Sequence, residues 1–217
     1  MRRVLAATFV SLDGVMQAPG APEEDPTGGF KLGGWTFNYF DQALGKVMGE
    51  VFVNPFDLLL GRKTYDIFAA YWPYQPEDPI GKAFNATTKY VATRSDKPLT
   101  WQNSIRLRDA ATEVAKLKQG DGPDLLIQGS GNLIQTLLAN RLIDQYKVLV
   151  FPLFLGRGKR LFGEGAIPGA LKLVDNTVST TGVVVSTYVP AGEVVPGSFA
   201  TQEPSAAELE RRRELES

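Results

Sequence analysis

Two glycine-bearing turns constrain this chain most strongly, because each one follows an apolar run and opens a segment with helical spacing. The first turn, residues 61–64, follows the leucines at 58–60, and the second, residues 129–132, follows the apolar residues 125–127. Glycine lets the backbone approach a bound anion, and the following helix directs free N–H groups and the positive end of its dipole toward it. Two such turns predict a ligand with a long phosphate bridge, held from two sides.

A basic pair, Arg62 and Lys63, adds charge to the first turn, as an additional phosphate group would require. Taken singly, each turn also fits a simpler interpretation, in which glycine only lets a strand and a helix pack tightly. The same choice arises at residues 156–159, where we favour a plain turn over an anion site.

Composition excludes several classes of protein. The chain has 217 residues, of which 43% are hydrophobic and 22% are charged, which is enough apolar material for one sizeable core. The formal net charge of -1 gives no electrostatic footprint for nucleic acid or for an anionic membrane. The longest apolar stretch, residues 148–155, is far shorter than the roughly 20 residues of a membrane-spanning helix. We therefore expect no nucleic-acid partner and no membrane partner.

The chain contains neither histidine nor cysteine. The lack of histidine excludes Ser-His-Asp and Cys-His catalysis, histidine-based metal sites and the commonest side chain for proton transfer near neutral pH. The lack of cysteine excludes a disulfide scaffold. Any chemistry must use carboxylates, tyrosine, lysine, water or a cofactor, and we expect no metal.

The amino terminus has features of a short signal peptide, because Met1-Arg2-Arg3 precedes the apolar residues 4–10. The apolar part is minimal, however, and Asp13 follows it without a small-residue cleavage pattern. We interpret residues 4–10 as a buried strand and expect the protein to be cytoplasmic.

Apolar runs alternate with helical spacing along most of the chain. The expected strands are residues 4–10, 57–60, 89–93, 124–128, 145–151, 171–177 and 182–189, and the expected helices are 36–53, a short one carrying Tyr65 and Phe68, 109–118 and 131–140. This alternation indicates an α/β fold with a largely parallel sheet. The last two strands have no helix between them, so we expect the sheet to end antiparallel. Residues 71–79, rich in proline and aromatics, are interpreted as an ordered loop.

A long irregular segment, residues 11–35, follows the first strand, and we call it the long loop. Loops of this length inside a compact domain usually serve function. Asp13 either bonds the backbone of its own turn or serves a site, and Trp35 either anchors the loop in the core or forms a substrate wall. Residues 191–217 are interpreted as a tail outside a domain of residues 1–190, either solvated with a short charged helix or partner-binding.

Five motifs follow one another along the chain: SLDG at 11–14, DLLLGRKTY at 57–65, KYVATRS at 89–95, LIQGSG at 126–131 and FPLFLGRGKRLF at 151–162. In this order they resemble the dihydrofolate reductase superfamily, and most closely the bacterial reductases similar to the C-terminal domain of the riboflavin-biosynthesis deaminase-reductase. The resemblance covers residues 3–189. It implies a three-layer sandwich around a mostly parallel sheet, formed by the domain of residues 1–190.

The resemblance also implies bound NADPH and hydride transfer to a small heterocycle, pterin-like or ribosylaminopyrimidine-like, or to a conjugated carbonyl. It assigns Arg62 to the adenosine 2′-phosphate and Thr64 to the pyrophosphate. The other cofactor-binding residues that it implies are Gly61, Lys63, Thr93, Arg94, Ser95, Gly129, Ser130, Gly131, Asn132 and Leu133. It further implies a homodimer, and a long loop that closes over the nicotinamide.

The chain departs from folate reductases on the first long helix, where those enzymes carry the carboxylate that holds the pterin. Counting from Trp35, Phe40 stands near that position, and Asp41 follows one residue later, turned by about 100° on a helix. The resemblance therefore does not extend to folate as substrate. We expect Trp35 and Phe40 to contact the substrate, with core packing as the alternative for Phe40. We expect Asp13, Asp41 or an ordered water to supply the proton, and a helix-start role is the alternative for Asp41.

Two other functions remain open on the sequence. The same scaffold suits a non-catalytic nucleotide-binding or regulatory protein, which would bind NADPH without hydride turnover. It also suits an interaction module, in which a two-fold dimer and the charged tail carry the function and no cofactor binds. Among these we favour the reductase, with a small-molecule substrate.

Overall fold

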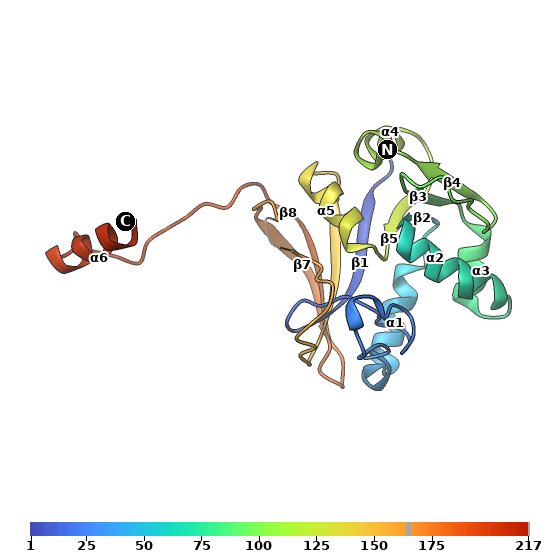
Figure 1. The fold of residues 1–217 in the computed structure, drawn as a ribbon, viewed down its shortest axis with the longest axis horizontal. Helices are drawn as coiled ribbons and strands as arrows, with labels where there is room; N and C mark the ends of the chain where they lie inside the picture. The colour runs from blue at the N-terminus through green and yellow to red at the C-terminus, as the bar shows by residue number, and fades with distance from the viewer. Residues whose placement is uncertain (164–165, 217) are drawn as a thin grey trace.

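The computed structural model describes residues 1–163 and 166–216. Its centre is an eight-stranded sheet in the order β4-β3-β2-β5-β1-β6-β8-β7 (Figure 1). The strands are β1 (Val4–Ser11), β2 (Phe56–Gly61), β3 (Lys89–Ala92), β4 (Ser104–Leu107), β5 (Asp124–Ile127), β6 (Gln145–Phe151), β7 (Leu171–Val178) and β8 (Val184–Pro190). The strands from β4 to β6 in this order are parallel, whereas β8 and β7 pair antiparallel. The predicted α/β fold, with a mostly parallel sheet that ends antiparallel, is confirmed.

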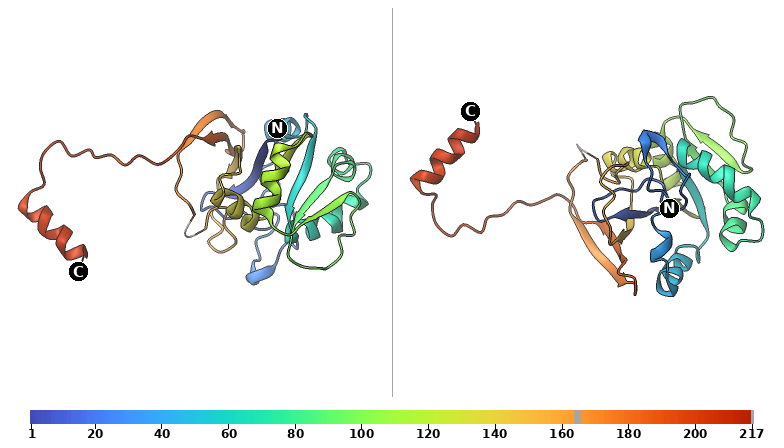
Figure 2. Two further views of the ribbon diagram at one scale, coloured as in Figure 1. Left: turned by 90° about the horizontal axis from the view of Figure 1, so that it is seen from above. Right: turned by 60° about the horizontal axis from the view of Figure 1, so that its bottom comes forward.

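Helices cover both faces of the sheet and form three layers with it (Figure 1 and Figure 2). The α-helices are α1 (Gln42–Val51), α2 (Arg62–Tyr71), α3 (Pro79–Ala86), α4 (Ala110–Gln119), α5 (Gly131–Ala139) and α6 (Ala206–Glu216), and short 3-10 helices are η1 (Thr27–Gly29), η2 (Phe37–Tyr39) and η3 (Trp72–Tyr74). On one face, α5 packs its Leu133 against Leu59 and Ile127 of the strands. On the other face, α1 packs Leu44 against Phe151, while α2 and α3 share a second apolar cluster.

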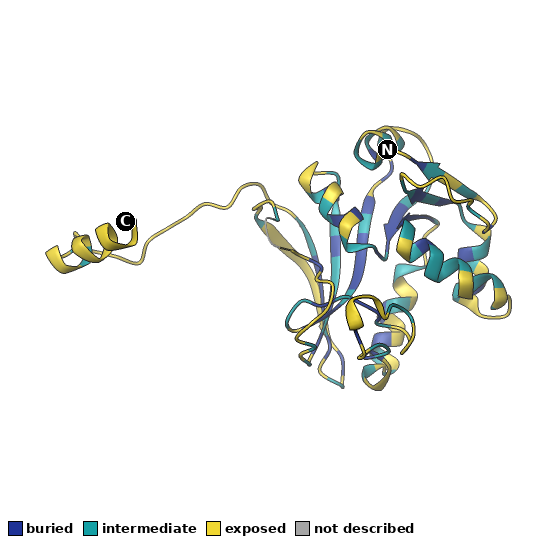
Figure 3. Cartoon of the chain, viewed as in Figure 1, coloured by how far each residue is buried: buried dark blue, intermediate teal, exposed yellow. Residues whose placement is uncertain are grey.

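The parallel strands are apolar without alternation because both of their faces are covered. In β2, every residue from Asp57 to Gly61 is buried (Figure 3). The carboxylate of Asp57 is tolerated there because the guanidinium of Arg2, which is also buried, donates to it. The edge strand β7, by contrast, is exposed along its whole length.

Helix α1 begins later than the apolar spacing of residues 36–53 predicts. Asp41 has an extended backbone, and its carboxylate accepts from the Leu44 amide at 2.7 Å, so the helix starts at Gln42. The segment before it forms η2. Phe37 and Phe40 therefore continue the apolar spacing of the helix without belonging to it.

Two elements, α3 and β4, were not expected from the sequence. Helix α3 has proline at its first position and is capped by Asp78, whose carboxylate accepts from the amides of Ile80 at 2.8 Å and Gly81 at 3.0 Å. Strand β4 is the outer parallel strand, paired with β3, and within it Leu107 alone is buried. An outer strand of this kind lacks the continuous apolar run that marks the central strands.

After β8 the chain leaves the sheet as an extended segment that leads to α6 (Figure 1). Helix α6 buries no residue and is crossed by ion pairs from Arg211 and Arg212 to Glu208. None of the described helices combines the length and the apolar character needed to cross a membrane.

A buried lysine makes the stability of this fold depend on pH. The ammonium of Lys89 donates to the carbonyls of Asn85 at 3.0 Å and Thr87 at 2.8 Å, and it lies 4.4 Å from the centre of the Trp101 ring. Burial lowers the pKa of Lys89 from 10.5 to about 8, although the charge of Asp57 opposes this change. The folded protein therefore holds this proton less tightly than the unfolded chain.

We predict that the free energy of unfolding rises, relative to a Lys89→Met variant, as the pH increases from about 8 to 10.5. Within this window the folded state has released the proton that the unfolded chain still holds, so a higher pH favours folding by up to about 3 kcal/mol. Below the window both states are protonated, and the difference between the two proteins is constant. Urea unfolding of both proteins over a pH series measures the effect, and a pH-independent difference would contradict it.

Candidate functional site

The two glycine turns lie side by side at the carboxyl end of the sheet, because β2 and β5 are parallel neighbours. The amide of Gly61 donates to the carbonyl of Gly129 at 3.4 Å. A Cβ atom on Gly61 would stand 2.0 Å from Ser130 Oγ, and one on Gly129 would stand 2.7 Å from Thr64 Oγ1. Both positions therefore require glycine for the turns to approach each other.

We call residues 61–64 and 129–132 together the glycine cradle. In the described part of the chain, neither of its helices, α2 and α5, begins with a side-chain cap. Helices α1, α3 and α4, by contrast, each begin with an aspartate whose carboxylate accepts from first-turn amides: Asp41, Asp78 and Asp109. The cradle therefore presents the free N–H groups and the positive dipole ends of two helices, an arrangement suited to an anion.

Arg62 belongs to the cradle, but its guanidinium is engaged within the protein. Its Nε donates to the carboxylate of Asp66 at 3.0 Å, and its terminal nitrogens donate to the carbonyls of Lys97 at 2.8 Å and Pro98 at 3.4 Å. A guanidinium held in this way cannot also grip a phosphate with two parallel bonds. The geometry therefore does not support the expected contact of Arg62 with a 2′-phosphate, and it makes Arg62 a support for the loop after β3.

The loop after β3 carries the other residues expected near the adenosine, namely Thr93, Arg94 and Ser95. It lies beside the first turn of the cradle, because β3 pairs with β2. The Ser95 amide donates to Thr93 Oγ1 at 3.1 Å, and Arg108 donates to the Arg94 carbonyl at 2.6 Å. The side chain of Arg94 is exposed. Arg94 thus has an exposed guanidinium beside the cradle, whereas the guanidinium of Arg62 is engaged within the protein.

The second half of the cradle opens α5. Asn132 is exposed in its first turn, whereas the side chain of Leu133 is buried in the core. Of the cofactor contacts expected for Leu133, only those of its backbone therefore remain open. The carbonyl of Arg160 lies 3.3 Å from the place of a Cβ on Gly131. The segment after β6, residues 152–162, consequently borders the cradle, and we call it the basic loop.

Asp13 fastens the long loop to the basic loop. Its carboxylate accepts from the hydroxyl of Ser11 at 2.5 Å and from the amides of Leu155 at 3.1 Å and Gly156 at 2.8 Å, with the guanidinium of Arg160 at 3.8 Å. Burial by itself would raise the pKa of Asp13, but these hydrogen bonds outweigh it and keep the pKa below the ordinary value. A carboxylate bonded in this way is a poor proton donor. The geometry makes Asp13 a clamp between loops and does not support the expected catalytic role.

Asp41, the second expected proton donor, is engaged in the same manner. One oxygen caps α1, and the other accepts from the hydroxyl of Thr180 at 2.6 Å and from its amide at 2.8 Å. The bonds from Thr180, and then the one from Leu44, lower the pKa of Asp41. Asp41 thus starts a helix and ties it to the turn between β7 and β8, and a catalytic role is not supported.

Trp35 and Phe40, expected to contact a substrate, lie in different environments. Trp35 is buried, donates from Nε1 to the Gln17 carbonyl at 2.8 Å and meets the edge of Phe151 at 5.2 Å between ring centres. It anchors the long loop in the core. Phe40 is 45% exposed and packs edge-on against Phe9 at 6.2 Å. Of the two, only Phe40 keeps an aromatic surface available to a ligand.

Sequence reasoning missed the side chains that hold the long loop against the basic loop. The Gln17 amide donates to the carbonyls of Asp25 at 2.8 Å and Thr27 at 2.9 Å, and its oxygen accepts from the Lys159 amide at 3.0 Å. The Lys159 ammonium donates to the Thr27 hydroxyl at 2.8 Å and to the Asp25 carboxylate. The glycines and basic residues around Lys159 were a visible signal, but no local pattern connects them to Gln17 or Asp25.

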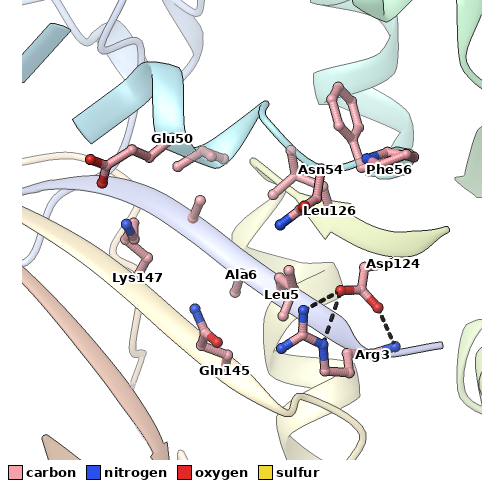
Figure 4. Close-up of a pocket in the computed structure, with 13 residues that line it drawn as sticks. Arg3, Leu5, Ala6, Glu50, Asn54, Phe56, Asp124, Leu126, Gln145 and Lys147 are labelled. Carbon is pink, nitrogen blue, oxygen red and sulfur yellow. Dashed lines mark hydrogen bonds and ion pairs between the residues drawn. The ribbon is translucent and has the colours of Figure 1, made fainter. Parts of the chain in front are cut away.

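A cavity of about 140 Å³ lies at the opposite end of the sheet, where the parallel strands begin (Figure 4). It is lined by Leu5 of β1, Glu50 of α1 and Lys147 of β6, and by Arg3 and Asp124, which form an ion pair of 2.5 Å. Because the cradle lies at the carboxyl ends of the same strands, this cavity is separate from it. No group of three side chains suited to a metal ion occurs among residues 1–163 and 166–216.

The family model of the RibD C-terminal domain matches residues 2–185 of this chain. Among curated proteins, the uncharacterized protein YyaP of Bacillus subtilis (strain 168) is 32% identical to it over 143 residues, which cover 63% of this chain and 76% of YyaP.

Solved structures share the fold at lower identity. A candidate riboflavin biosynthesis protein from Shewanella sp. PV-4 matches with a TM-score of 0.58 and 21% identity, covering 88% of this chain and 99% of that one. Dihydrofolate reductase from Enterococcus faecalis, solved in complex with NADP(H) and RAB-propyl, matches with a TM-score of 0.55 and 15% identity, covering 87% and 96%. These likenesses confirm the predicted dihydrofolate-reductase-like fold.

We predict that Gly61→Ala destabilises the protein by about 1–3 kcal/mol, because the added methyl group collides with Ser130 and separates the two turns. Gly45 in α1 provides a matched control, since a Cβ there meets nothing within 4 Å. Gly45→Ala is expected to stabilise by roughly 0.5–1 kcal/mol, because alanine replaces glycine inside a helix. Urea denaturation of the three proteins measures both effects, and a stabilising Gly61→Ala would show that the turns do not touch.

Proposed function

The chain belongs to the RibD C-terminal domain family, and we propose that it is a reductase that binds NADPH and transfers a hydride to a small heterocycle or a conjugated carbonyl. Family membership supports an oxidoreductase as the broad assignment. We infer the identity of the cofactor and the class of acceptor from the geometry of the site.

The glycine cradle is the observation that carries the proposal. The uncapped starts of α2 and α5 lie there at the ends of adjacent strands, and two neighbouring helix starts suit the two phosphates of a pyrophosphate bridge better than a single anion. Glycine at positions 61 and 129 leaves room for the side chains of Ser130 and Thr64, so the two turns pack closely and bring both helix starts together. The residues present therefore fit a dinucleotide.

In this proposal, the first-turn amides of Lys63 and Thr64 bind one phosphate, and those of Gly131 and Asn132 bind the other. Arg94 binds the adenosine 2′-phosphate, because its exposed guanidinium can form two parallel bonds to a phosphate. The bound cofactor supplies the hydride. The long loop, fastened to the basic loop, covers the site and excludes water from it.

The substrate is proposed to stack on Phe40, whose exposed ring suits a flat, conjugated molecule. Asp13 and Asp41 are both held in structural hydrogen bonds, so we assign the proton to water. This assignment favours acceptors that take their proton on an oxygen or nitrogen within reach of solvent. Pterin-like and ribosylaminopyrimidine-like heterocycles and quinone-like carbonyls meet this requirement.

A second candidate is a nucleotide-binding regulatory protein on the same scaffold. The structural engagement of Asp13 and Asp41 favours it, because neither carboxylate is available for catalysis. It shares the cradle and the cofactor with the reductase, so hydride turnover alone separates the two.

We further propose that residues 1–190 form the reductase domain of a cytoplasmic homodimer, with residues 191–217 as a tail outside it. The exposed edge strand β7 supports the dimer, because Leu171, Leu173, Val174 and Val178 are each between 45% and 59% exposed there.

Titration of the pure protein with NADPH and with NADH tests the proposed function. Pterin-like, ribosylaminopyrimidine-like and quinone-like acceptors are then added, and the absorbance of the reduced nicotinamide is followed. Loss of absorbance with any of them supports the reductase. Binding without turnover on the whole panel supports the regulatory candidate, and a protein that binds neither dinucleotide contradicts both.

We predict that Arg94→Ala weakens NADPH binding by about tenfold or more and leaves NADH binding nearly unchanged, because only NADPH carries the 2′-phosphate. Arg62→Ala is expected to weaken both dinucleotides, since Arg62 supports the loop that carries Thr93 and Ser95, the residues expected near the adenosine that both dinucleotides share. Arg141→Ala, an exposed arginine beyond the end of α5, is the control for loss of charge. Calorimetric titration measures all three, and a selective loss of NADPH affinity in Arg62→Ala, together with unchanged NADPH affinity in Arg94→Ala, would return the 2′-phosphate to Arg62.

A further inference from the structure

Two lysines lie next to the glycine cradle, one in each of two segments that border it. Lys63 lies in the first turn of α2, beside Thr64, which touches the second turn. Lys159 lies in the basic loop, where the carbonyl of the next residue, Arg160, lies 3.3 Å from the Cβ place of Gly131. The two lysines therefore belong to segments that border the two halves of the cradle.

The positive charge of these lysines is only partly balanced. The Lys159 ammonium contacts and repels that of Lys63, and both effects lower the pKa of Lys63 below the ordinary lysine value. The carboxylate of Asp25 bonds Lys159 and is only 12% exposed, and it also attracts Lys63. One carboxylate thus faces two ammonium groups, which leaves an excess of positive charge beside two uncapped helix starts.

Building on the dinucleotide-binding function proposed above, we infer that Lys159 and Lys63 together bind one phosphate of the pyrophosphate bridge, and that Lys159 thereby fastens the long loop over the bound cofactor. The Lys159 side chain can act in both ways because its ammonium carries several donors. Two of its hydrogen bonds already go to Asp25 and Thr27 of the long loop. A phosphate placed between the lysines replaces their repulsion with attraction and makes loop closure depend on the ligand.

This role differs from the one proposed for Arg94. The pyrophosphate is common to NADPH and NADH, so removal of Lys159 weakens the binding of both dinucleotides equally. Removal of Arg94, by contrast, weakens the binding of NADPH and leaves that of NADH nearly unchanged. Inorganic pyrophosphate, which lacks the nicotinamide and the adenosine, is therefore a direct probe of the lysine pair.

Calorimetric titration of the full chain with NADPH, NADH and inorganic pyrophosphate tests the inference. Lys159→Gln is expected to weaken all three by about tenfold or more, and Lys159→Arg to retain most of the affinity. Arg157→Gln removes a charge from the same exposed loop and is the matched control, expected to stay within about twofold of wild type. In the double variant Lys159→Gln/Lys63→Gln, the two losses of affinity are less than additive, because the removal of either lysine already disrupts binding of the shared phosphate.

Hydrogen exchange of residues 17–30 provides a second measurement that does not depend on activity. Pyrophosphate is expected to slow exchange in the wild-type protein and in Arg157→Gln, and to leave it unchanged in Lys159→Gln. A lysine that only latches the loop would alter exchange in the free protein without changing pyrophosphate affinity, and that result would overturn the inference.

The failures of the inference and of the proposed function are distinguishable. If the wild-type protein binds NADPH and NADH, and Lys159→Gln binds both as tightly as Arg157→Gln does, the inference is wrong and the dinucleotide site stands. If the wild-type protein binds neither dinucleotide, the proposed function fails and the inference fails with it.

Discussion

The parallel pairing of β2 with β5 is the contact on which the site depends. Because parallel neighbours end at the same edge of a sheet, the two glycine turns meet there, and the helices that follow both start at one place. Glycine at positions 61 and 129 leaves room for the side chains of Ser130 and Thr64, which lets the turns pack together. The remaining helices on the sheet use an aspartate cap, so the missing caps of α2 and α5 set this place apart.

Around the cradle, charged side chains mainly hold the structure together. Asp13 joins the long loop to the basic loop, Asp41 starts a helix and ties it to a distant turn, and Arg62 supports the loop after β3. Each of these groups has the chemistry of a catalytic or binding residue, yet its hydrogen-bonding capacity is already used. The proposed site consequently offers backbone amides, lysines and an aromatic surface, and the proposal assigns redox chemistry to a cofactor and proton transfer to solvent.

The fold class was predictable because its signals are local. Continuous apolar runs such as the leucines of β2 mark strands covered on both faces, and most of these runs lie within a residue or two of the observed strands. Helix α3 and strand β4 escaped prediction, since α3 is short and β4, at the outer position, has little of its surface buried. The family resemblance, which the family model confirms, rested on motifs that are short and contiguous.

The order of residues in the chain was sufficient to place glycines, apolar runs and basic residues where strands turn into helices, and so to indicate the fold and the family. It was not sufficient to say which polar group is free. Asp13, Arg62 and Lys159 find their partners on loops remote in the sequence, and hydrogen bonds between such segments leave no periodic trace in it. Whether a carboxylate or a guanidinium can serve a ligand depends on those partners, because a group with satisfied hydrogen bonds has little left to offer a second one.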